Sequence, residues 1–122
     1  MAANKTIRFG PTTITAAAKN LVNPNVTSLA GPVGFTMTQP YVILRHIRLV
    51  NTTASAITTS LFVGATGGSA AGTEFFGSAI SISANSATDW YGLLRLDSAD
   101  FLTSTASGAG LTFEAEGEVG IS

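Results

Sequence analysis

The segment Leu111–Ile121 alternates between apolar and polar residues, and this pattern constrains the fold more than any other in the chain. Its odd-numbered positions are Leu, Phe, Ala, Gly, Val and Ile, while glutamates stand at three of the positions between them. Successive side chains of a β-strand point to opposite faces of the sheet. The segment is therefore predicted to be a half-buried antiparallel strand with one face on a core and the other in solvent.

The polar face of this strand would carry Glu114, Glu116 and Glu118 as a stripe of carboxylates roughly 7 Å apart. Like charges at this spacing repel one another, so the stripe requires either water or basic neighbours. The body of the chain offers three arginines for that purpose, Arg45, Arg48 and Arg95.

Most of the remaining chain shows the same preference for short strands. Thr, Val, Ile, Phe and Ser dominate, turn residues recur at short intervals, and helical periodicity is almost absent. The other expected strands are Thr6–Phe9, Thr12–Ala16, Tyr41–Asn51, Ile57–Ala65, Glu74–Gly77, Ala79–Ala84, Thr88–Asp97 and Phe101–Thr105. We predict an all-β fold in one domain over residues 1–122, an antiparallel, jelly-roll-like β-sandwich of about eight strands.

Residues 20–40 interrupt this pattern with several prolines and glycines and no clear periodicity. A segment of that length is usually a functional loop or an arm. Its apolar residues need a surface to lie on, so we expect an ordered arm and an interface through Val26, Leu29, Val33, Phe35 and Met37. Residues 1–40 would then hold the N-terminal strands and this arm, and residues 41–122 the main sandwich.

The strand Tyr41–Asn51 has no purely polar face. A bulge near Arg45-His46 could redirect its alternation, or both of its faces could be partly covered. In the next strand, Ile57, Thr59, Leu61 and Val63 are expected on one face. Phe62 is expected on the exposed opposite face, which makes it a further interface candidate.

Charged residues make up 11% of the chain, against roughly a quarter in an ordinary soluble domain. Such a chain covers its surface with small polar residues, hides it against partners, or does both. Residues 1–50 hold five basic residues and no acid, and residues 74–122 hold all seven acids. The two sets could pair within one fold, pair between copies, or be solvated; the interface candidates among them are Arg45, Arg48, Glu114, Glu116 and Glu118.

The sequence offers little that would support catalysis. His46 is the only histidine and lies in the middle of a strand, where we expect a structural role. With one histidine and no cysteine, zinc lacks its usual ligands. Asp89, Asp97 and Asp100 could bind calcium or cap turns, and capping is the preferred interpretation. We expect no enzymatic activity, no cofactor and no metal.

Nucleic acid and membranes are not expected partners either. Lys5, Arg8 and Lys19 are too few for a nucleic-acid arm, because such binding scales with the number of phosphates neutralised. The longest aliphatic or aromatic run is Tyr41–Leu44, far short of a membrane span of roughly 20 residues. Met1–Arg8 has no apolar signal-peptide core, so we expect synthesis in the cytoplasm without a secretion signal.

Four segments within residues 41–122 resemble small structural proteins of tailed bacteriophages, the β-sandwich decoration (cement) proteins of the capsid and related virion proteins. They are Ile47-Arg48-Leu49-Val50-Asn51-Thr52-Thr53, Leu61-Phe62-Val63-Gly64-Ala65, Leu94–Leu102 and Gly110-Leu111-Thr112-Phe113. The resemblance implies a virion protein added to an assembled head, which it binds and stabilises. Its partners would be the major capsid protein and copies of itself, as a trimer or another homo-oligomer.

Two other interpretations stay open at this point. One is a structural or host-attachment module of the phage tail or fibre. The other is a carbohydrate-binding β-sandwich, in which Tyr41, Trp90 and Tyr91 would form a platform for stacking sugar rings.

Overall fold

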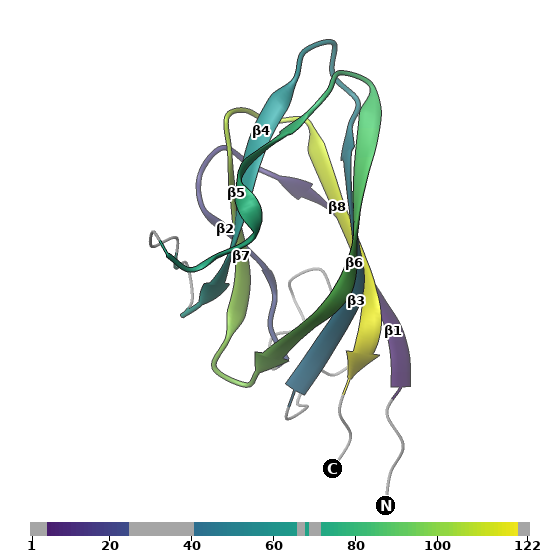
Figure 1. Ribbon diagram of the computed structural model, residues 1–122, viewed down its shortest axis with the longest axis vertical. Helices are drawn as coiled ribbons and strands as arrows, with labels where there is room; N and C mark the ends of the chain where they lie inside the picture. The colour runs from purple at the N-terminus through teal and green to yellow at the C-terminus, as the bar shows by residue number, and fades with distance from the viewer. Residues whose placement is uncertain (1–4, 25–40, 66–67, 69–71, 120–122) are drawn as a thin grey trace, which may run out of the picture.

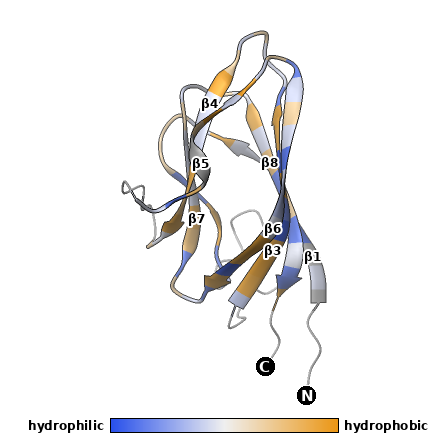
Figure 2. Cartoon of the chain, viewed as in Figure 1, coloured by the Kyte–Doolittle hydropathy of each residue, from blue (hydrophilic) through white to orange (hydrophobic). Residues whose placement is uncertain are grey.

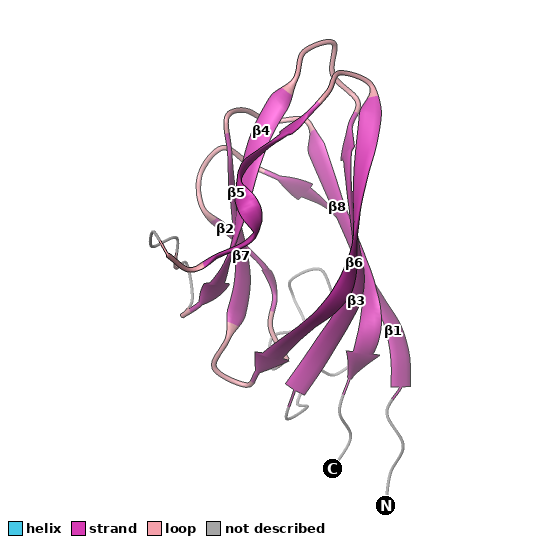
Figure 3. Cartoon of the chain, viewed as in Figure 1, coloured by secondary structure: helices cyan, strands magenta, loops and turns pink. Residues whose placement is uncertain are grey.

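The fold is seen in a computed structural model that describes residues 5–24, 41–65, 68 and 72–119. These residues form eight β-strands and no helix (Figure 3). The strands are β1 (Lys5–Ile14), β2 (Lys19–Val22), β3 (Tyr41–Asn51), β4 (Ile57–Gly64), β5 (Glu74–Ile82), β6 (Ser86–Asp97), β7 (Phe101–Ala106) and β8 (Leu111–Val119). The predicted all-β class is confirmed.

The eight strands form two antiparallel sheets that pack against each other (Figure 1). The first sheet has the order β1-β8-β3-β6 and the second the order β2-β7-β4-β5. Except between β4 and β5, each strand is followed along the chain by a strand of the opposite sheet. This is the strand order of an eight-stranded jelly roll, so the predicted β-sandwich is confirmed in its topology as well.

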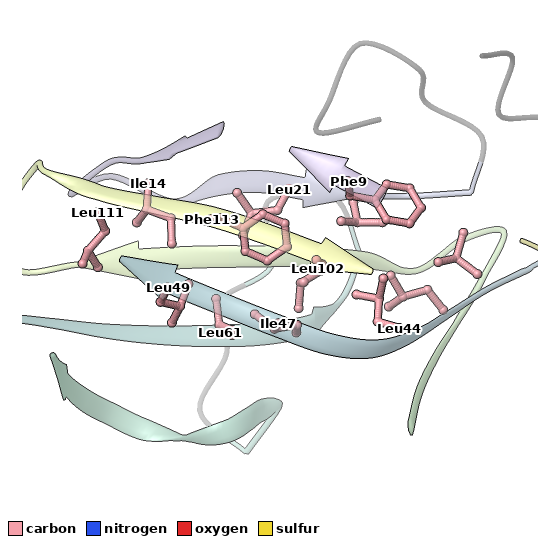
Figure 4. Packing of buried hydrophobic residues seen from close by; sticks show 14 of the residues in the cluster. Phe9, Ile14, Leu21, Leu44, Ile47, Leu49, Leu61, Leu102, Leu111 and Phe113 are labelled. Carbon is pink, nitrogen blue, oxygen red and sulfur yellow. The ribbon is translucent and has the colours of Figure 1, made fainter. Parts of the chain in front are cut away.

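The core lies between the two sheets. Figure 4 shows side chains of the first sheet, such as Phe9 and Phe113, meeting side chains of the second sheet, such as Leu61 and Leu102. All four are fully buried. Along β8 every odd-numbered residue from 111 to 119 is buried, as the alternation predicts. Figure 2 shows the corresponding change between hydrophobic and hydrophilic segments along the strands.

The N-terminal strands differ from the prediction. The two short strands expected on either side of Gly10-Pro11 are one strand, β1, whose register against β8 shifts between Phe9 and Thr12. Gly10 has φ +86°, and a Cβ atom there would lie 2.6 Å from the carbonyl oxygen of Phe113. Glycine thus lets the chain pass this irregularity without leaving the sheet.

Two other boundaries also differ. The segments expected as Glu74–Gly77 and Ala79–Ala84 form the single strand β5. The first residues of the expected arm belong to β2, which pairs with β7 at the edge of the second sheet. The arm residues Val26, Leu29, Val33, Phe35 and Met37 lie outside the described residues.

Of the two alternatives left open for Tyr41–Asn51, the structure shows a bulge in strand β3. Its register slips between Leu44 and His46 against both neighbours, β6 and β8. As a result Leu44 and Ile47 both face the core, three positions apart, while His46 and Arg48 face outward. The bulge therefore lets the apolar residues of β3 face the core while its charged residues face outward.

Candidate interaction surface

The outer face of the first sheet gathers most of the charged residues singled out in the sequence. Arg45, His46 and Arg48 come from β3, the glutamate stripe comes from β8, and Asp89 comes from β6. The acids and bases that are far apart in the sequence thus alternate across three neighbouring strands. Of the alternatives left open, pairing within one fold is observed for Arg45 with Glu118, for Arg48 with Asp89 and for His46 with Asp89 and Glu116.

Two ion pairs join the arginines of β3 to the neighbouring strands. Arg45 Nε lies 2.6 Å from Glu118 Oε2, as expected for the carboxylate stripe. Arg48 is opposite both Glu114 and Asp89 in register, and its Nη1 lies 3.6 Å from Asp89 Oδ1. These arginine side chains are about half exposed, so each pair contributes only about 0.2–1 kcal/mol of stability.

Arg95, the third arginine expected to neutralise the glutamate stripe, interacts with other residues. Its Nε lies 2.9 Å from Asp97 Oδ1, and its guanidinium carbon lies 4.4 Å from the centroid of the Tyr41 ring. This is the geometry of a cation–π contact. Arg95 therefore extends the charged outer face to the end of β6 and does not neutralise the glutamate stripe.

His46 lies at the centre of this surface, between two carboxylates. Its Nε2 is 2.8 Å from Asp89 Oδ1, and its Nδ1 is 3.2 Å from Glu116 Oε1. The ring also stacks on Tyr91, with centroids 4.6 Å apart and planes 8° from parallel. This arrangement could not be predicted from the position of His46 in an apolar run. It depends on the bulge, which directs His46 outward, and on β6 and β8, which supply the two carboxylates.

The surroundings of His46 favour its charged form. Burial, the largest single influence, lowers the pKa, but the hydrogen bonds to Asp89 and Glu116 and the two negative charges together raise the pKa above its ordinary value of 6.5. The imidazolium can donate a hydrogen bond to each carboxylate at once, whereas neutral imidazole has a single N–H. Three further side chains lie near the imidazole ring or its carboxylate partners. Arg48 lies beside Asp89, Tyr91 stacks on the ring, and Arg8 is opposite Glu116 in register.

This arrangement predicts a pH-dependent contribution to stability. Because the pKa of His46 is higher in the folded chain than in the unfolded chain, its stabilisation is complete below about pH 6.5. It is lost as the pH rises through the folded-state pKa. Urea unfolding of the wild type and of His46→Gln should give a difference in unfolding free energy that shrinks as the pH rises above about 6.5. An Asp89→Asn/Glu116→Gln background should flatten that dependence, and a difference that grows with pH would contradict this assignment.

Beside the charged residues, β6 exposes two large hydrophobic side chains. Tyr91 is 72% exposed and Leu93 is 63% exposed, and no other large hydrophobic residue is this exposed in the described part of the chain. Both point outward, because Trp90 and Leu94 on either side of them pack against the core. Tyr91 and Leu93, flanked by the Arg95–Tyr41 pair, are called the β6 patch below.

The other predicted surface residues lie elsewhere. Phe62 is predicted to be exposed, but its side chain is only 7% exposed, so this prediction is wrong. It does lie on the face opposite Leu61, but β4 is an inner strand, and Phe62 is flanked by Thr103 of β7 and Glu74 of β5.

The aromatic platform expected for sugar binding is not formed by the three residues proposed. Trp90 faces the core side of β6 and its ring lies 5.0 Å from that of Phe75, whereas Tyr91 faces outward. An open hollow of about 380 Å³ lies beyond Arg48, near the end of the first sheet. None of the three aromatic residues lines it; its walls are Arg48, Val50, Asn51, Thr52, Asn85, Ser86 and Ala87.

The described residues contain no group of three or more acidic or histidine side chains placed to hold a metal ion. Within the same ranges, no helix has the length and apolar character to cross a membrane. Comparison with protein-family models, with curated proteins and with solved structures gave no match.

Proposed function

We propose that this protein is a structural component of a virion, a decoration protein that binds the assembled head of a tailed bacteriophage and acts without catalysis. The β6 patch is the observation that carries the part of the proposal concerning protein contacts. Tyr and Arg are enriched at protein–protein interfaces, and the energetically dominant residues of an interface are often aromatic. An exposed Tyr91–Leu93 pair beside three outward arginines has this composition.

The β-sandwich fold and the sequence resemblance support the particular assembly. A jelly roll presents wide sheet faces on a rigid core, and jelly rolls occur in viral capsid domains. The resemblance of residues 41–122 to decoration proteins adds the head of a phage as the place of binding. The major capsid protein and further copies of this chain are the partners that follow from it.

The proposal is tested on purified particles. Virions of the phage that encodes this chain, purified on a density gradient, should contain the protein in many copies by quantitative mass spectrometry. Antibody labelling in the electron microscope should place it on the head. Labelling on the tail would favour a tube, fibre or attachment module instead, and absence of the protein from particles would contradict any role in the virion.

A further inference from the structure

We propose that the β6 patch is the contact between two copies of this chain, in which β6 of one copy pairs edge to edge with β6 of the other about a two-fold axis at Gly92. This inference rests on the proposed function, because it names which protein partner the patch contacts. The two first sheets would then join into one continuous eight-stranded sheet across the dimer.

The position of β6 in the sheet makes this contact possible. Among the described strands it is an edge strand that pairs with β3 alone, and at 12 residues it is longer than the other edge strands β1, β2 and β5 (Figure 1). Exposed edges of this length template pairing with another chain. Of the residues whose exposure is described, the two most exposed large hydrophobic ones lie on this strand, so the edge and the apolar patch coincide.

The outward residues of β6 are complementary to themselves when the strand is reversed. In antiparallel pairing about Gly92, Asp89 lies opposite Arg95 of the second copy, and Tyr91 lies opposite Leu93. By symmetry each of these pairs occurs twice, as in any isologous interface. The outer face then places opposite charges on the flanks and apolar side chains at the centre, and directly opposite pairs of both kinds stabilise a sheet.

Neighbouring registers lack this complementarity. An axis at Leu93 would place Asp89 opposite Asp97 of the second copy, and like charges directly opposite are destabilising. An axis at Tyr91 would place Asp89 opposite Leu93 and leave Arg95 opposite Ala87. If the pairing were shifted by a single residue, each outward side chain of one copy would lie opposite a core-facing residue of the other copy. The pairing centred on Gly92 is therefore the one that the side chains select.

The first experiment measures the oligomeric state. Light scattering coupled to size exclusion should give twice the 12.4 kDa mass of the chain. A monomer at a protein concentration of about 100 μM, well above the Kd of an ordinary specific dimer, or a trimer, would overturn the inference.

Charge reversal then tests the flanking pairs. Arg95→Glu places two acids opposite each other twice in the dimer, and Asp89→Lys does the same with two bases. Each variant alone should weaken dimerisation on the order of 10- to 100-fold. Mixed in equal amounts they should form a heterodimer, because the introduced lysine then faces the introduced glutamate and the two unchanged residues, Asp89 and Arg95, face each other. Circular dichroism of each variant checks that it is folded, and a mixture that stays monomeric would overturn the pairing.

Disulfide trapping tests the register independently of charge. The chain has no cysteine, so introduced thiols report without background. Tyr91→Cys and Leu93→Cys proteins mixed under mild oxidation should cross-link to each other. Either protein alone should cross-link poorly, because residues related by a diagonal lie roughly 7–8 Å apart. Equal cross-linking within each variant alone would exclude the axis at Gly92.

These results are separable from the test of the proposed function. A dimer that is absent from virions would contradict the virion role and leave the β6 pairing intact. A monomer that is present on virions would contradict the pairing and leave the virion role intact.

Discussion

Replacing Gly117 by valine should cost about 3 kcal/mol of unfolding free energy or prevent folding altogether. Gly117 lies in β8 opposite the bulge of β3, and a Cβ atom there would collide with the backbone of β3 at the carbonyl oxygen of Ile43 and the Cα of Leu44. Because the obstacle is backbone, no change of rotamer can relieve the contact. Either β8 and β3 separate, or the bulge that directs His46 outward is lost.

Gly64→Val is the matched control for this variant. Gly64 also lies in an inner strand, but a Cβ atom there would meet nothing within 4 Å. Its substitution should change the unfolding free energy by less than about 1 kcal/mol. Urea unfolding of both variants at equal pH gives the comparison. If Gly117→Val were as stable as Gly64→Val, β8 and β3 would not approach each other as closely as described.

Replacing Asn51 by alanine should destabilise the fold by about 3 kcal/mol, since it removes four hydrogen bonds of a fully buried side chain. Asn51 is fully buried at the end of β3. Its Nδ2 donates to the carbonyl oxygens of Ser55 and Ile82, at 2.8 and 3.0 Å, and its Oδ1 accepts from the backbone N–H and the hydroxyl of Thr53. One side chain thus holds the β3–β4 turn and links the first sheet to β5 of the second.

Asn51→Asp is the more specific test of this role. A carboxylate can still accept from Thr53, but it cannot donate to the two carbonyl oxygens, so the variant should lose nearly as much stability as the alanine variant. Thr52→Ala, at the adjacent exposed position, should stay within about 0.5 kcal/mol of the wild type. Thermal unfolding monitored by circular dichroism would show the order, and an Asn51→Asp protein as stable as the wild type would contradict the assigned hydrogen bonds.

Most of the fold can be predicted from the sequence because the strongest patterns are local. The alternation of residues 111–119 and the turn residues between strands require no knowledge of tertiary contacts, and the sandwich follows from them. The bulge in β3 is also visible, as a conflict between Arg45-His46 and the apolar residues on either side. By contrast, the single strand β1 could not be predicted, because Gly10-Pro11 is an ordinary turn signal and only the pairing with β8 keeps the strand intact.

The candidate surface can be predicted only in part. The glutamate stripe and Arg45 come together as expected, since charge alone suggests it. The placement of His46 between Asp89 and Glu116 depends on which strands neighbour β3. Local sequence patterns do not determine the order of strands in a sheet. Trp90 and Tyr91 are likewise expected to form one aromatic platform because they are adjacent in sequence, but adjacent side chains of a strand point to opposite faces of the sheet.

The central place of β8 in its sheet has a consequence for how the chain folds during synthesis. Strand β8 lies between β1 and β3 and is the only hydrogen-bonded neighbour of β1 among the described strands. A nascent chain that has emerged as far as β7 can therefore pair β3 with β6 but leaves β1 without a partner. The first sheet closes only after β8 has left the ribosome. Since the pairings that complete it are far apart in sequence, we expect this closure to take roughly milliseconds to seconds once β8 has emerged.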